Sequence, residues 1–286
     1  MIALILGNPH LRSPWLGLGL TGLMMAVVYA QIFQGLLREW LEFPSLSHGF
    51  AIPLISAYLV WARHSRIVHA PLATSLWGLP ILLLGLAALV VGVRGEETFL
   101  ARLSFPVTLF GLTLLLAGWE VIKQTWMAIA YLTFMIPLPW TTLAGAMDES
   151  RLLDAILSAQ AVRLLGVPIH RDGVLLHLPN ATLEVAGVCT SVPAIAALLS
   201  LAAAYVVLTK RPLWIRSLLL LAIVPLAVIS NTIRIATTAF GVYYIGVVTL
   251  SSFYHKFTGT VTFVIAFILL LGIDAMLLRT AGWRSR

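Results

Sequence analysis

Long apolar stretches recur along the whole chain and constrain its fold more than any other feature. A helix that crosses a bilayer needs about 20 mostly apolar residues, because the hydrocarbon core is roughly 30 Å thick. We therefore predict an all-α polytopic membrane protein of about eight transmembrane helices, forming a single domain over residues 1–286. The predicted spans lie near 15–33, 46–62, 76–93, 104–121, 124–140, 190–208, 214–238 and 257–278.

The composition excludes a soluble protein. The chain is 60% hydrophobic and only 10% charged, whereas a soluble domain carries roughly 25% charged residues. A net charge of +7 could indicate nucleic-acid binding, but the basic residues are scattered singly between apolar stretches. They fit the cytoplasmic loops of a membrane protein better. We expect contact with membrane lipid and no nucleic-acid partner.

The loop charges predict an orientation, since short loops rich in Lys and Arg stay in the cytoplasm. If both termini are cytoplasmic, the inner loops collect most basic residues, including Arg63, Lys123 and Arg216. The outer loops then collect acidic residues such as Glu97 and Glu184. No small-residue cleavage site follows the first apolar stretch, so we expect it to stay as an anchor in the plasma (inner) membrane.

One long polar stretch, 141–188, falls on the outer side as an extracytoplasmic insertion. Its first part has the pattern of an amphipathic helix that lies in the membrane interface. Its second part has the pattern of a hairpin, with strands near 174–178 and 182–185 around the turn signal Pro179-Asn180. The helix alternates an apolar set, Leu152, Leu153, Ile156, Leu157, Val162 and Leu164, with a polar set, Asp148, Glu149, Arg151, Asp154 and Arg163.

The hairpin leads directly into Cys189, which is the only cysteine of the chain. A single cysteine excludes an internal disulfide and a zinc site built on several cysteines. The histidines form no convincing ligand cluster, so we expect no metal and no cofactor. A lone cysteine at a helix start is more often a small apolar filler than a reactive thiol.

Two further residues are expected at the same depth as Cys189, because consecutive helices alternate in direction. Arg234 lies late in the seventh span, which starts inside, and His255 precedes the eighth span on the outer side. An arginine at mid-membrane costs about 2.5–3.5 kcal/mol and usually faces a polar cavity or partner. Near the interface it could extend to the headgroups, and His255 could be an ordinary interfacial residue. The convergence of all three favours a site.

The three side chains would suit thiol chemistry. Helix N-termini and nearby cations lower the pKa of a thiol and favour the nucleophilic thiolate. His255 would act as general base and then general acid, and Arg234 would stabilise a thiolate or an oxyanion. Gly259 and Phe263 follow His255 at four-residue spacing and leave a gap beside it. The supporting candidates are Asn231, which could orient Arg234 or merely satisfy its hydrogen bonds, Thr190 or Ser191 as N-cap, and Glu184.

These motifs resemble the exosortase/archaeosortase family of polytopic membrane cysteine transpeptidases. Three signatures occur in order, Val185-Ala186-Gly187-Val188-Cys189, then Asn231-Thr232-Ile233-Arg234-Ile235, then His255 with Gly259 and Phe263. Earlier stretches are also similar to the family: Ser47-His48-Gly49, Ile136-Pro137-Leu138-Pro139 and Leu165-Gly166-Val167-Pro168. One position departs, since Cys189 is followed by Thr190-Ser191 where the family shows Ser-Gly or Thr-Gly.

The resemblance implies a Cys-Arg-His site at Cys189, Arg234 and His255, with His48 as a supporting residue. It implies substrates that are exported proteins with a C-terminal sorting signal. That signal consists of a short motif (Pro-Glu-Pro in the best-known class), a membrane helix and a basic tail. The enzyme would cleave at the motif on the extracytoplasmic side, form a thioester, and pass the protein to a surface acceptor that the sequence does not identify.

Two other functions stay open from the residues alone. A transporter or channel could line a polar pathway with Arg234 and His255, although the paired, repeated broken helices of many transporters are not evident. A non-catalytic assembly factor for surface polysaccharide could use the same cavity to bind lipid or a partner.

Overall fold

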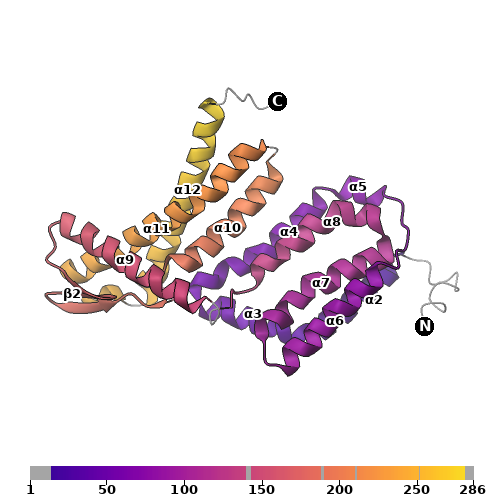
Figure 1. Cartoon of the computed structure of the whole chain (residues 1–286), viewed down its shortest axis with the longest axis horizontal. Helices are drawn as coiled ribbons and strands as arrows, with labels where there is room; N and C mark the ends of the chain where they lie inside the picture. Colours follow the sequence, from indigo (N-terminus) through magenta and orange to yellow (C-terminus); the bar gives the residue numbers. More distant parts are fainter. Residues whose placement is uncertain (1–13, 140–142, 188–189, 210, 251, 281–286) are drawn as a thin grey trace.

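The computed structural model describes residues 14–139, 143–187, 190–209, 211–250 and 252–280 (Figure 1). The predicted all-α class is confirmed, with one small sheet as its only β-structure within these ranges. The α-helices are α2 Pro14–Val28, α3 Ala30–Glu42, α4 Ala51–Trp61, α5 His64–Val68, α6 Gly78–Arg94, α7 Thr98–Ala117, α8 Trp119–Tyr131, α9 Ala144–Leu164, α10 Ser191–Leu208, α11 Leu213–Tyr244 and α12 Ser252–Thr280. Short 3-10 helices are η2 Pro44–Phe50, η3 Leu132–Met135 and η5 Val247–Leu250.

Four helices of the described chain are long and apolar enough to cross a membrane, which supports a membrane protein but does not establish the predicted number of eight. They are α7, α10, α11 and the part of α12 from Phe257. The apolar helices over 46–61 and 78–94 are shorter. The predicted first span is divided at Tyr29, which has φ −99° and ψ 8° and separates α2 from α3.

Two predicted boundaries were wrong because local backbone geometry overrides hydropathy there. The span predicted near 104–121 starts at Thr98, where the Glu97 carboxylate accepts a hydrogen bond from the Phe99 N–H at 3.4 Å. It ends at Gly118, whose φ of +84° is a conformation that favours glycine. The span predicted near 124–140 therefore begins earlier, as α8, and passes into η3.

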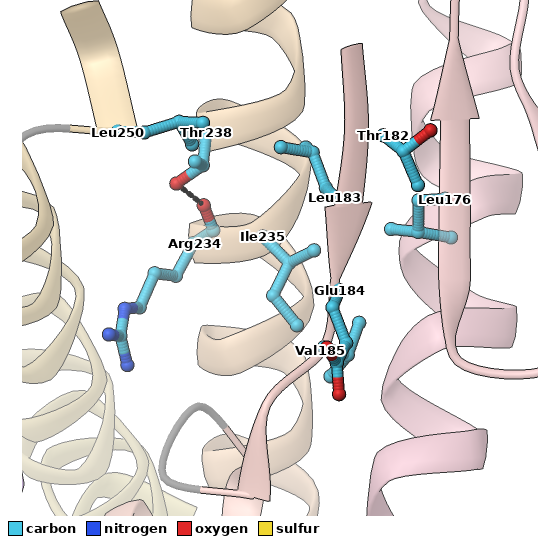
Figure 2. Close-up of a pocket in the computed structure, with 9 residues that line it drawn as sticks. All are labelled: Leu176, Thr182, Leu183, Glu184, Val185, Arg234, Ile235, Thr238 and Leu250. Carbon is cyan, nitrogen blue, oxygen red and sulfur yellow. Dashed lines mark hydrogen bonds between the residues drawn. The ribbon is translucent and has the colours of Figure 1, made fainter. Parts of the chain in front are cut away.

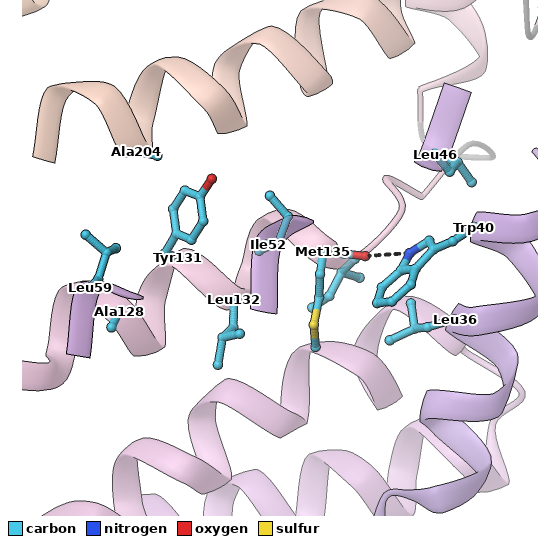
Figure 3. Close-up of a cluster of buried hydrophobic side chains, with 11 residues drawn as sticks. Leu36, Trp40, Leu46, Ile52, Leu59, Ala128, Tyr131, Leu132, Met135 and Ala204 are labelled. Carbon is cyan, nitrogen blue, oxygen red and sulfur yellow. Dashed lines mark hydrogen bonds between the residues drawn. The ribbon is translucent and has the colours of Figure 1, made fainter. Parts of the chain in front are cut away.

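The described helices α2–α8 form one group, and α10 packs against it. Tyr131 of α8 points toward α10 and donates a hydrogen bond to the Ser200 carbonyl at 3.0 Å (Figure 3). Trp40 donates its indole N–H to the Met135 carbonyl at 3.2 Å, which ties α3 to η3. Ala204 of α10 belongs to the same buried cluster as these side chains. This contact joins the two halves of the molecule.

The second group contains α9–α12 and the sheet. The sheet is antiparallel in the order β1-β2-β3, with strands His170–Asp172, Leu175–Leu178 and Ala181–Glu184. The predicted hairpin is confirmed as β2 and β3, and β1 was missed. Figure 1 shows α9 and β2 at one end of the α10–α12 bundle, far from the last turns of α12. At the opposite end, Arg211 binds Asp274 at 2.9 Å and links the α10–α11 loop to α12.

The predicted amphipathic helix exists as α9, but its polar and apolar sets do not divide as expected. Asp154, placed on the polar face, is fully buried, and Leu164, placed on the apolar face, is 88% exposed. Leu152 and Leu153 are also exposed. Asp154 is buried because it has a polar partner in another helix, Ser191 at the start of α10.

Candidate active site

The helix α11, which carries Arg234, is longer than one membrane crossing requires. It has 32 residues, or about 48 Å at 1.5 Å per residue, against roughly 30 Å of hydrocarbon core. A crossing of about 20 residues counted from Leu213 would end next to Arg234. Beyond it, Ala236, Ala239 and Val242 pack in one buried cluster with α9 and the sheet.

The guanidinium group of Arg234 reaches across to α12. A Cβ atom added at Gly259 would lie 3.6 Å from its Cζ and Nε atoms, so the group lies over the bare backbone of Gly259. The two helices are also joined by a hydrogen bond from the Ser230 hydroxyl to the Thr262 carbonyl at 2.9 Å. The space that the sequence predicted at Gly259 is therefore occupied by the Arg234 side chain.

The remaining members of the predicted triad are only partly described. Cys189 lies outside the described residues, and so does the side chain of His255. Position 255 itself belongs to α12, one turn before Gly259 and before the apolar part that starts at Phe257. The structure thus brings Arg234 within one helical turn of position 255, and the meeting of all three side chains stays a prediction.

The supporting candidates divide between two places. Asn231 is buried one turn before Arg234, and its role toward Arg234 stays a prediction. Thr190 occupies the N-cap position of α10 but makes no side-chain capping bond, and its hydroxyl donates to the Gly187 carbonyl at 3.0 Å instead. Ser191 donates its hydroxyl to Asp154 at 2.5 Å. His48 lies in η2 and lines a different cavity from Arg234.

A cavity of about 240 Å³ lies between β3 and α11 (Figure 2). Arg234 and Glu184 both belong to its lining; Glu184 lies on the β3 side, and the Arg234 side chain points away from β3. The Thr238 hydroxyl donates a hydrogen bond to the backbone carbonyl of Arg234 at 2.9 Å, and not to its guanidinium group. The lining residues are Leu176, Thr182, Leu183, Glu184, Val185, Arg234, Ile235, Thr238 and Leu250.

A second cavity, of about 250 Å³, lies between η2, η3 and the first turns of α10. Its walls are apolar apart from His48 and Thr133, and Val192 and Pro193 of α10 line it. Val185 lines the first cavity and Val192 the second, so the chain passes from one to the other through the segment that contains Cys189.

A family model described as transmembrane exosortase matches residues 40–272. The chain belongs to the exosortase family. No curated protein and no solved structure matches it. The matched residues run from the end of α3 into α12, and they include His48, both cavities and all three candidate catalytic positions.

In this exosortase, sequence reasoning missed the contribution of α9 to the site. Arg151 donates to the Val185 carbonyl at 2.9 Å and binds Glu184 at 3.0 Å, just before the cysteine. Asp154 accepts hydrogen bonds from Ser191, just after it. The signal was present as Ser150, Asp154 and Ser158, a polar stripe at four-residue spacing in α9. Within the described residues, no His, Cys, Asp or Glu side chains gather as a metal site.

Proposed function

We propose that this exosortase is a membrane-embedded cysteine transpeptidase or protease that cleaves C-terminal sorting signals on the extracytoplasmic side. The family match supports a role in protein sorting. The observation that carries the chemistry is the position of Arg234, with its guanidinium group over Gly259, one turn from position 255. Arg234 also belongs to the lining of the cavity that contains Glu184 and Val185, and these two residues lead to Cys189.

In the proposed reaction, the Cys189 thiol gives its proton to His255 and its sulfur attacks the scissile carbonyl carbon. A C–S bond forms, and Arg234 stabilises the negative charge that develops on the carbonyl oxygen. Collapse of this intermediate breaks the C–N bond, and the leaving amine takes the proton from His255. The resulting thioester is then attacked by an acceptor nucleophile, which regenerates the free thiol.

The two cavities could hold two different parts of the sorting signal. We infer that an extended motif lies in the cavity beside β3, which Glu184, Arg234 and two threonines line together with apolar residues. The apolar residues that follow the motif in the sorting signal would lie in the second cavity, which is apolar. In this proposal residues 1–286 act as one membrane unit with both termini cytoplasmic, and 141–188 is its outer insertion.

The test is co-expression with an exported protein of the same genome that ends in a short motif, an apolar helix and a basic tail. We expect the wild-type chain to shorten this protein. Cys189→Ala and Cys189→Ser should insert in equal amounts and leave the protein uncut. Normal shortening by Cys189→Ala would refute the proposed function, and a transport activity that survives the substitution would favour a transporter.

A further inference from the structure

The start of α10 is capped by a carboxylate from another helix. Both side-chain oxygens of Asp154 in α9 bind Ser191: one accepts from the backbone N–H at 2.8 Å, and the other from the hydroxyl at 2.5 Å. The Ser150 hydroxyl adds a third bond at 3.3 Å. Asp154 is 0% exposed and Ser191 1%. This is a buried, fully ligated contact between residues 37 positions apart.

Capping of the α10 N-terminus alone does not explain why a carboxylate from another helix is used. The first N–H groups of a helix lack intrahelical partners, and a negative group there is favourable. A hydroxyl at the N-cap usually supplies the acceptor locally, and Thr190 has one but points it to Gly187. Burying a carboxylate is costly unless it is well bonded. What Asp154 adds over a local cap is a fixed position of α10 relative to α9.

The same face of α9 holds the chain on the other side of Cys189. Arg151, one turn before Asp154, binds the Val185 carbonyl and the Glu184 carboxylate. One more turn back, the end of Met147 lies 3.6 Å from where a Cβ of Gly187 would be. One helix therefore contacts residues 184, 185, 187 and 191. These contacts flank Cys189 on both sides.

We propose that Asp154 is a positioning residue for Cys189: it fixes Ser191, and with Arg151 it sets where the thiol-bearing segment lies relative to Arg234. The expected effect of Asp154 on catalysis rests on the proposed function. Its effect on the reactivity of Cys189 does not, because that reactivity can be measured without turnover.

The test uses the full chain in detergent and follows two quantities. One is kcat and KM for cleavage of a sorting-signal substrate. The other is the rate of alkylation by iodoacetamide, which reports Cys189 alone because the chain has no other cysteine. The variants are Asp154→Ala, Asp154→Asn and Ser191→Gly. The matched control is Ser158→Ala, since Ser158 lies one turn further along α9, is equally buried, and its hydroxyl has no partner among the described residues.

We expect Asp154→Ala to lower kcat about tenfold or more with little change in KM, because small misplacements of a reacting group are costly. Its alkylation rate should change at least about threefold. Asp154→Asn keeps an acceptor for the Ser191 N–H and should recover most of kcat, and Ser191→Gly should fall between them. Ser158→Ala should stay within about twofold of wild type in both quantities.

The outcomes separate the two proposals. Wild-type kcat and alkylation rate in a folded Asp154→Ala would show a purely structural role and overturn the inference. If Asp154→Ala does not fold, Ser191→Gly decides, and wild-type values of both quantities in that variant would overturn it. If Cys189→Ala still cleaves, the proposed function fails, and the alkylation rates alone decide whether Asp154 positions Cys189.

Discussion

The Arg234 side chain can contact α12 because Gly259 has no side chain there. Its Cζ and Nε atoms lie 3.6 Å from the position where a Cβ of Gly259 would be, which is an ordinary van der Waals distance. One methyl group therefore fits at position 259, but a longer side chain occupies the space of the guanidinium group. Gly259 is needed for its small volume rather than for its backbone freedom.

We predict that Gly259→Ala keeps cleavage within about threefold of wild type. Gly259→Leu should displace Arg234 and lower kcat by about 100-fold, the scale of losing one oxyanion-stabilising donor. Substrate cleavage and melting temperature in detergent would be measured for both. Equal activity of the Ala and Leu variants would show that Arg234 does not act from this position.

At the residue scale, the sequence singled out Arg234 as a candidate but placed Asp154 on the wrong face of its helix. An arginine inside an apolar span stands out, because it is unfavourable there without a polar partner. Asp154 looked like an ordinary solvent-facing residue of an amphipathic helix. Its partner is 37 positions away in another helix, and single-sequence patterns carry no information on such pairings.

At the scale of the elements, α6 and α7 pack through a regular series of small residues. Gly78, Gly85 and Gly92 recur every seven positions in α6, and a Cβ at any of them would collide with α7. The facing positions are Leu115, Thr108 and Ala101, also seven apart and in the reverse order. Small residues allow the close approach of helices on which membrane proteins depend.

We predict that Gly85→Leu destabilises the protein by at least about 1–3 kcal/mol, the usual cost of overpacking. Unfolding in detergent against increasing sodium dodecyl sulfate would measure it. Gly272→Leu is the control, since Gly272 is also in a helix but has nothing within 4 Å of its Cβ position. A loss of stability equal to that of the control would contradict the role of this packing.

Hydropathy predicted the positions of some helices but not the α7–α8 boundary or strand β1. The stretches 190–208 and 257–278 were placed closely, because apolar runs bounded by polar residues mark such helices. The α7–α8 boundary was missed because it depends on the φ of Gly118. Strand β1 was missed because three residues, His170–Asp172, give no alternation to detect.

At the scale of the molecule, the end of the bundle with α9 and the sheet is proposed to face outward. On a Cys189→Ala background, we predict that Asp172→Cys in β1 reacts with a membrane-impermeant maleimide on intact cells. Arg66→Cys in α5 should react only after the membrane is permeabilised. Both positions are exposed in the structure, so both can react once reached. Labelling in the reverse order would invert the proposed topology.

The whole-molecule arrangement was the hardest part to predict. Loop charges give an order of inside and outside, but they do not say that α10 joins the two helical groups through Tyr131 and Ser200. They also do not predict that the last turns of α11 pack on α9. The start of α10 lines the second cavity, and the strand that precedes it lines the first.

The most direct test of the central claim is the intact mass of the protein after brief mixing with substrate. An acyl-enzyme on Cys189 predicts a mass increase equal to the N-terminal part of the substrate, removed by hydroxylamine and absent in Cys189→Ala. His255→Ala and Arg234→Ala should slow its formation. Cleavage of the substrate by wild-type protein with no such adduct, or the same adduct in Cys189→Ala, would contradict a thioester at Cys189.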